Sequence, residues 1–193
     1  SGKGIVHSER TGDEARANGQ RVCGLQLWLA LPEELQEMDP EFLHYPSDDI
    51  PAIDVEGVAV RVMIGEAYGQ RSPVKQYSDT QYVEAAMPAG TSLSAPQNST
   101  ELALYPVEGS VEVNGIEIKQ HHMAILDTSC ELTLVASEDC RIAMIGGEPL
   151  GERHLFWNLV STSRERVEQA KQDWKEGRFD KVPGETEFIP LPE

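Results

Sequence analysis

A series of short apolar runs, each closed by turn residues, occupies the chain from about Gln81 to Gly147. The strongest turn signal is Asn114-Gly115, because both central residues of a type I′ hairpin turn need a positive φ angle. The predicted strands are Tyr82–Met87, Glu101–Val107, Ser110–Val113, Ile116–Lys119, His122–Leu126, Glu131–Ala136 and Cys140–Ile145. Short strands at this spacing predict an antiparallel sandwich or barrel.

Two further strands are predicted upstream of this series. The run Arg21–Leu31 alternates apolar and other residues, and Pro32 ends it. The run Val55–Gly65 is again typical of a strand. The acidic, proline-containing stretch 33–54 between them is too long for a hairpin loop, so it is predicted to link two units.

Near the start of the chain, a glycine-containing turn leads into a strand-like run that carries His7 and Glu9. Residues two apart on a strand point to the same face, so the imidazole and the carboxylate are expected to lie side by side. Both groups are ligands for first-row metals. Two ligands do not complete a metal site, and the alternative interpretation is a set of solvated polar residues at a frayed terminus.

One helix is predicted near the C-terminus. Thr162 is its predicted N-cap, with Glu165 completing a capping box. Gly177 stands where a glycine commonly ends a helix. The tail that follows has several prolines and no periodicity, and it is predicted to be an extended strap anchored by Phe179, Phe188 and Ile189.

The chain is strongly acidic, with 33 Asp and Glu against 16 Lys and Arg and a net charge of −17. This excess disfavours direct contact with nucleic acid or with an anionic membrane, and it predicts a solvated acidic surface. Apolar residues make up 39% of the sequence, an ordinary share for a globular core, and no run approaches the length of a transmembrane helix.

The three cysteines, Cys23, Cys130 and Cys140, show no CxxC spacing and leave an odd number. A disulfide scaffold is therefore not predicted, and reduced thiols in a cytoplasmic protein fit the count better. Cys130 and Cys140 are open to two interpretations. They form a redox pair across a hairpin, or they are small hydrophobic residues buried in a sheet.

Several separated motifs resemble the pirin family, in the same order along the chain. They are Gly4–Glu9 with its His-Ser-Glu, Gly24–Trp28, Leu31-Pro32, His44-Tyr45-Pro46, Ser72-Pro73-Val74, Gly147–Leu150, Asn158 and the C-terminal helix. Pirins are bicupins, so the resemblance implies an all-β fold of two antiparallel jelly-roll barrels with one C-terminal helix.

The resemblance also implies one metal, usually iron, held in the N-terminal barrel by three His and one Glu. His7 and Glu9 match the last two of these ligands, whereas the family's upstream His-x-His strand has no counterpart in this sequence. We therefore expect Fe(II), or another divalent metal, in a full-length parent, and weak or absent metal in this chain, whose N-terminal barrel is expected to be incomplete.

The resemblance further predicts three parts of the chain. Residues 1–54 are expected to be a remnant of the N-terminal cupin with the linker. Residues 55–155 are expected to form the C-terminal cupin, and residues 156–193 a closing strand, helix and extended tail.

The second barrel is predicted to be structural and without metal. Its Pro88-Ala89-Gly90 turn is not followed by a His-x-His pattern, and only Glu101 keeps a ligand-type side chain. His121 and His122 are adjacent, and on a strand they would point to opposite faces and could not bind one ion together.

Two functions are implied by the resemblance. The first is a quercetin 2,3-dioxygenase-type oxidoreductase acting on a flavonoid-like molecule, in which His7 and Glu9 bind the metal and Glu9 also serves as the catalytic base. The second is a redox-sensing regulator of the transcriptional-cofactor type, whose acidic surface would bind a basic protein. This chain alone is expected to be inactive, and a companion N-terminal fragment or a second copy is expected to cover its apolar residues around Val22 and Leu27.

Overall fold

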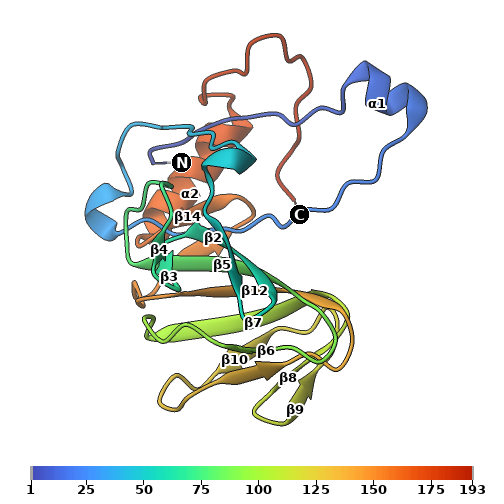
Figure 1. Cartoon of the computed structure of the whole chain (residues 1–193). Helices are drawn as coiled ribbons and strands as arrows, with labels where there is room; N and C mark the ends of the chain where they lie inside the picture. Colours follow the sequence, from blue (N-terminus) through green and yellow to red (C-terminus); the bar gives the residue numbers. More distant parts are fainter. Residues whose placement is uncertain (1, 193) are drawn as a thin grey trace. The chain divides into compact units, whose positions relative to one another are not determined.

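The structure is a computed structural model that describes residues 2–192, and the chain forms two compact units. One unit is Leu43–Pro149, and the other combines Ser1–Phe42 with Leu150–Glu193. Figure 1 labels helices and strands of both units. The predicted division into domains at residues 54 and 155 stays a prediction.

The unit Leu43–Pro149 is built from two antiparallel sheets. The larger sheet has the strand order β1-β2-β5-β12-β7-β10, and the smaller has the order β6-β11-β8-β9. The larger sheet consists of β1 (Ala52–Val55), β2 (Val58–Ile64), β5 (Thr80–Met87), β7 (Glu101–Glu108), β10 (Ala124–Leu126) and β12 (Cys140–Gly147). The smaller consists of β6 (Ser92–Ser94), β8 (Val111–Val113), β9 (Ile116–Ile118) and β11 (Thr133–Val135). The short hairpin of β3 (Glu66–Ala67) and β4 (Gln70–Arg71) and the 3-10 turn η2 (Ser47–Asp49) complete the unit.

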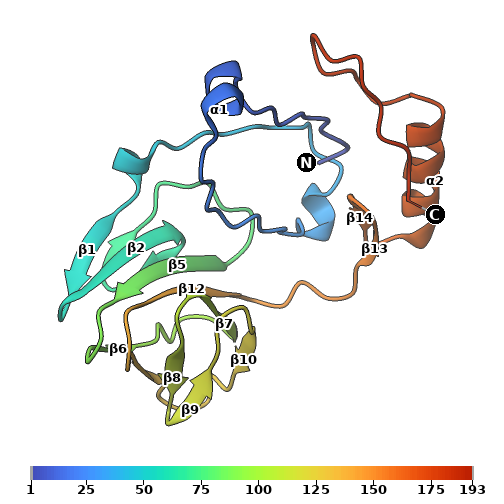
Figure 2. The same cartoon turned by 90° about the vertical axis from the view of Figure 1, so that its right-hand side faces the viewer.

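One apolar core lies between these two sheets. In Figure 2, β2 and β5 belong to one layer, and β8 and β9 lie in the other. Side chains from both sheets join the same buried cluster, and Val60, Val83, Leu104, Leu134 and Ile142 are each no more than 1% exposed. On β7 the buried positions alternate with half-buried ones, as expected for a strand with one face toward a core. The predicted antiparallel barrel is therefore confirmed.

The Asn114-Gly115 hairpin is confirmed as well. The two residues have φ angles of 48° and 82°, and they join β8 to β9. The Asn114 side chain also ties the turn to the next strand. Its Nδ2 donates to the Glu131 carbonyl oxygen at 2.9 Å, and its Oδ1 accepts from the Thr133 amide at 2.9 Å.

A second turn of the same kind was not predicted. The predicted run Val55–Gly65 is interrupted near its start by a turn at Glu56 and Gly57, whose φ angles are 53° and 87°. This turn joins β1 to β2 as a hairpin. Asp54 stabilises this turn, because its Oδ1 accepts from the Gly57 amide at 3.0 Å. The apolar pattern continues across the turn, so periodicity alone does not reveal it.

The other unit contains little regular structure. Its elements are the short helix α1 (Asp13–Asn18), the 3-10 turn η1 (Glu33–Leu35), the hairpin of β13 (His154–Phe156) and β14 (Leu159–Ser161), and the helix α2 (Arg164–Lys175). The predicted C-terminal helix is confirmed as α2, and α1 is an addition to the prediction of one helix.

The predicted cap of α2 is wrong by one residue. Ser163 is the N-cap, and its hydroxyl accepts from the Arg166 amide at 3.2 Å. Thr162 lies one residue before the cap, and its hydroxyl accepts from Gln36 at 2.9 Å. Gly177 follows the helix with a φ angle of 66°, as predicted.

Two predicted strands are not strands in the structure. The runs Ile5–Glu9 and Arg21–Leu31 have no ladder with any other described residue. A strand exists only where a neighbouring backbone supplies hydrogen bonds. The alternating pattern in these two runs is therefore compatible with a strand but does not by itself form one.

Among the described residues, no helix has both the length and the apolar character that crossing a bilayer requires.

The core of the two-sheet unit offers a direct test. Leu104→Ala removes a side chain that is fully buried on β7, so we expect a loss of about 2–5 kcal/mol in the free energy of unfolding. Ile125→Ala, on the neighbouring strand β10, is the matched control, because Ile125 is 77% exposed and should cost less than about 0.5 kcal/mol. Urea unfolding of both variants measures the difference, and equal losses would contradict the assigned core.

Candidate functional site

The predicted ligands His7 and Glu9 lie in an irregular segment, and both side chains are exposed to solvent. Imidazole and carboxylate are suitable ligands for iron. Among residues 2–192, however, no three His, Cys, Asp or Glu side chains come together as a metal-binding group. The pair therefore fits as two members of a donor set, and the described residues do not complete that set.

The backbone just before His7 is held in place. The Lys3 amide donates to the Met38 carbonyl oxygen at 2.9 Å, and the Lys3 ammonium forms an ion pair with Asp39. The hydrogen bond between the Lys3 ammonium and the Asp39 carboxylate, together with their opposite charges, raises the pKa of Lys3 and lowers the pKa of Asp39. The chain is thus fastened a few residues before the ligand pair.

The segment is also held just after His7, by the C-terminal tail. Arg10 Nε donates to Glu185 Oε1 at 2.9 Å, and a second guanidinium nitrogen donates to the other oxygen of the same carboxylate. Arg10 Nη1 also donates to Glu187 at 3.0 Å. Ser8, which stands between His7 and Glu9, also lies close enough to Glu185 to lower the pKa of its carboxyl. Arg10, the residue after Glu9, therefore anchors this segment to one carboxylate of the tail.

Sequence analysis missed this anchor. Arg10 and Glu185 are 175 residues apart. The available signal is their opposite charge, and in a chain with 33 acidic residues that signal does not select a partner.

The anchor makes a prediction about pH. Hydrogen bonds from Arg10 and Ser8 lower the pKa of Glu185 from 4.5 to about 2. Because the pKa of this carboxyl is lowered, the contribution of the Arg10–Glu185 contact to the free energy of unfolding is fully present above pH 4.5. This contribution is lost as the pH falls toward 2. We expect the carboxyl ¹³C signal of Glu185 to titrate near pH 2, and to return to the ordinary range in Arg10→Gln. A wild-type midpoint near 4.5 would contradict the bidentate contact.

The histidines of the two-sheet unit do not gather into a site. His121 lies in the turn before β10 with a φ angle of 63°, and His122 follows it, so neither is on the strand where the sequence places them. His121 Nδ1 lies 3.3 Å from the Tyr105 hydroxyl, and His122 Nδ1 lies 3.0 Å from the Gln120 carbonyl oxygen. Glu101 begins β7 and is exposed.

The cysteines are free thiols in different environments. Cys140 is buried on β12, and burial raises the pKa of its thiol, with a smaller contribution from the charges of Glu138 and Asp139. Cys130 and Cys23 are exposed. Cys140 therefore matches the interpretation as a small buried residue, whereas Cys130 does not.

An apolar stretch is exposed in the same unit as His7. Val22 is 76% exposed, Trp28 60%, Leu29 47%, Leu27 40% and Leu25 37%. These residues belong to the run that was predicted to be a strand.

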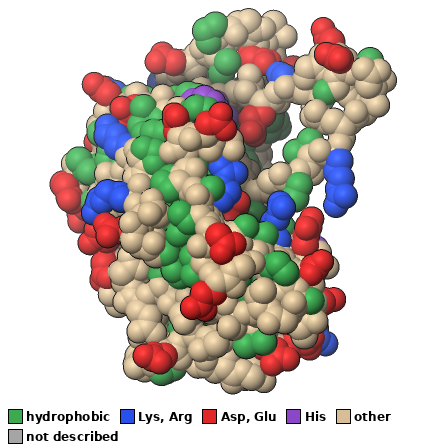
Figure 3. Space-filling view, in the orientation of Figure 1, with side chains coloured by type: hydrophobic (Ala, Val, Ile, Leu, Met, Phe, Trp, Pro, Cys, Tyr) green, Lys and Arg blue, Asp and Glu red, His purple; other side chains and the backbone are tan. Residues whose placement is uncertain are grey.

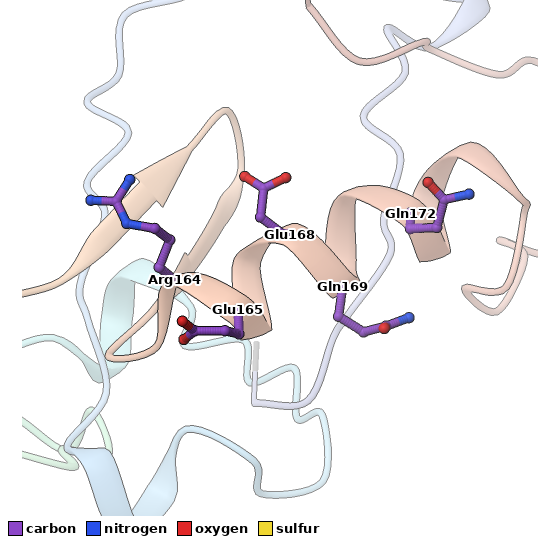
Figure 4. Close-up of a pocket in the computed structure, with 5 residues that line it drawn as sticks. All are labelled: Arg164, Glu165, Glu168, Gln169 and Gln172. Carbon is purple, nitrogen blue, oxygen red and sulfur yellow. The ribbon is translucent and has the colours of Figure 1, made fainter.

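One shallow depression lies along α2, and its five lining side chains all project from that single helix (Figure 4). A second follows α1, from Gly12 to Gln20. On the face that Figure 3 shows, acidic side chains are scattered with basic ones between them, in agreement with the predicted acidic surface.

Comparisons with known proteins agree with this fold. The pirin C-terminal cupin domain family matches residues 82–180. A quercetin 2,3-dioxygenase structure from Acinetobacter baumannii has a TM-score of 0.79 at 30% identity, covering 86% of this chain and 57% of that one. The two-sheet unit is thus a cupin, and the fold is all-β.

Sequence relatives define the family further. A pirin-like protein of Caulobacter vibrioides is 41% identical over all of this chain and 67% of its own length. A Pseudomonas aeruginosa protein provisionally named quercetin 2,3-dioxygenase is 32% identical over 94% of this chain and 58% of its own length. The chain belongs to the pirin family. It spans 58–67% of the length of the first curated relatives that it matches.

Proposed function

We propose that the full-length protein is a metal-binding bicupin that acts as a quercetin 2,3-dioxygenase-type oxidoreductase on a flavonoid-like substrate. This chain by itself is inactive. The observation that carries the proposal is the likeness, over most of the chain, to the quercetin 2,3-dioxygenase of Acinetobacter baumannii.

His7 and Glu9 have the roles of metal ligands in this proposal, with Fe(II) as the expected ion and other divalent metals as alternatives. Both side chains are exposed, so neither is buried against another described part of the chain. When bound, the metal would supply Lewis-acid and oxygen chemistry. Glu9 has the second role of accepting a proton from the substrate hydroxyl.

Quercetin consumption tests the proposal. The full-length protein reconstituted with Fe(II) should bleach the quercetin absorbance under O₂. His7→Ala should lower the rate of quercetin consumption by more than the roughly 10–100-fold that removal of an outer partner of a metal ligand costs. His44→Ala is the matched control, because His44 is also exposed but lies in the cupin unit Leu43–Pro149. Turnover that is unchanged in His7→Ala would overturn the assigned ligand.

A regulator that binds a protein partner is the second candidate, and the net charge of −17 favours it. Such an acidic surface attracts basic proteins and repels nucleic acid. A full-length protein that leaves quercetin untouched, yet binds a specific basic protein in a salt-dependent way, would place the regulator first.

The exposed apolar stretch 22–29 leads to a proposal about assembly. We propose that a companion N-terminal segment or a second copy covers it, because apolar patches of this kind mark interaction surfaces. Light scattering during size-exclusion chromatography should find this chain associated, and Val22→Ser should weaken the association. Ile116→Ser, at a residue that is 69% exposed on β9, is the control and should change nothing. A well-behaved monomer without a companion fragment would contradict the proposal.

A further inference from the structure

The tail from Phe179 to Ile189 is fastened to α2 near both of its ends. The ring centroids of Phe179 and Phe188 lie 5.6 and 5.5 Å from that of Trp174. The Trp174 indole nitrogen also donates to the Ile189 carbonyl oxygen at 2.8 Å. The residues between these contacts therefore form a closed loop, which we call the tail loop (residues 179–189).

The middle of the tail loop carries Glu185. A turn holds this residue, because its amide donates to the Val182 carbonyl oxygen at 3.1 Å and the preceding Gly184 has a φ angle of 81°. Its side chain is only 22% exposed, whereas that of Glu187 is 73% exposed. Glu185 is thus the better fixed of the two carboxylates that Arg10 contacts.

The tail loop contacts the N-terminal segment at two separate places. The first is at Gly4, where an added Cβ would lie 2.7 Å from the Phe179 ring. The second is at Arg10, which binds both carboxylate oxygens of Glu185. His7 lies between these two places.

The contact that anchors this segment does not use the side chains of the proposed metal ligands. His7, Glu9 and Arg10 are all exposed, and the bond to the tail loop comes from Arg10. An anchor of this kind restricts the backbone without occupying either metal-ligand side chain. Charge-assisted bidentate contacts are the strong members of their class and also fix orientation.

We propose that Glu185 is a positioning residue, through which the tail loop holds residues 4–10 in one conformation and so pre-orders His7 and Glu9 as metal ligands. The ordering of residues 4–10 by the tail loop can be tested in this chain alone, whereas its effect on metal affinity rests on the proposed function. Pre-ordering matters because a site whose ligands are already placed binds without the entropy cost of fixing them.

Backbone dynamics test the ordering in this chain without metal. Amide ¹⁵N order parameters of Val6–Glu9 should be near the rigid value of about 0.85 in the wild type and fall below about 0.6 in Glu185→Gln. Glu187→Gln is the matched control, because it makes the same change in charge on the same guanidinium but removes a single exposed contact. Arg10→Gln should reproduce the effect of Glu185→Gln, and the double variant should add nothing further.

Metal affinity tests the positioning in the full-length protein. With Co(II) as a spectroscopic probe, Glu185→Gln should weaken binding by about 10–100-fold, the range found for partners that orient metal ligands. Glu187→Gln should stay within about threefold of the wild type.

The outcomes separate the two claims. Unchanged order parameters in Glu185→Gln would overturn the holding role of the tail loop. Increased motion without weaker Co(II) binding would overturn the positioning role. Co(II) binding that is unaffected by His7→Ala would overturn the proposed ligand, while the ordering by Glu185 would still stand on its own measurement.

Discussion

Burial of one apolar layer between two antiparallel sheets is the constraint on which the cupin unit depends. Val83 and Ile142 from the larger sheet and Leu134 from the smaller are all fully buried in it. Close packing makes such a layer sensitive to single methyl groups. The backbone also approaches closely, since a side chain at Gly146 would lie 2.6 Å from the Glu101 carbonyl oxygen. Strand register and core packing therefore support each other.

Different interactions stabilise the other unit, which combines the two ends of the chain. Its long irregular segments gain few backbone ladders, and specific side-chain contacts take their place. Gln36 hydrogen-bonds to Thr162, and Arg10 hydrogen-bonds to Glu185. The Trp174 ring packs against the aromatic residues of the tail. Trp157 joins the same cluster, with its ring centroid 5.2 Å from that of Trp174. Each contact is exposed or half-buried, so a single substitution can release a segment while the cupin core stays folded.

Local signals account for the parts that sequence analysis predicted well. Asn114-Gly115 specifies its own turn, because few residue pairs tolerate two positive φ angles. Apolar alternation identified β5, β7 and β12, where both neighbours of each strand are present. The same alternation at Arg21–Leu31 led to a wrong prediction, since no described strand lies beside it. The cap of α2 was misplaced by one residue because Thr162 and Ser163 both carry a hydroxyl suited to capping, and the local sequence does not choose between them.

The sequence by itself determined the all-β fold and the pirin family, because periodicity, turn chemistry and local motifs are properties of neighbouring residues. It also predicted His7 and Glu9 as metal ligands. Only the tertiary structure decided that Arg10 is tied to Glu185. That contact joins opposite ends of the chain, and opposite charge alone does not choose among many acidic residues. The contacts of the tail loop with Trp174 select Glu185 as the partner of Arg10, because they hold its carboxylate where Arg10 can reach both oxygens.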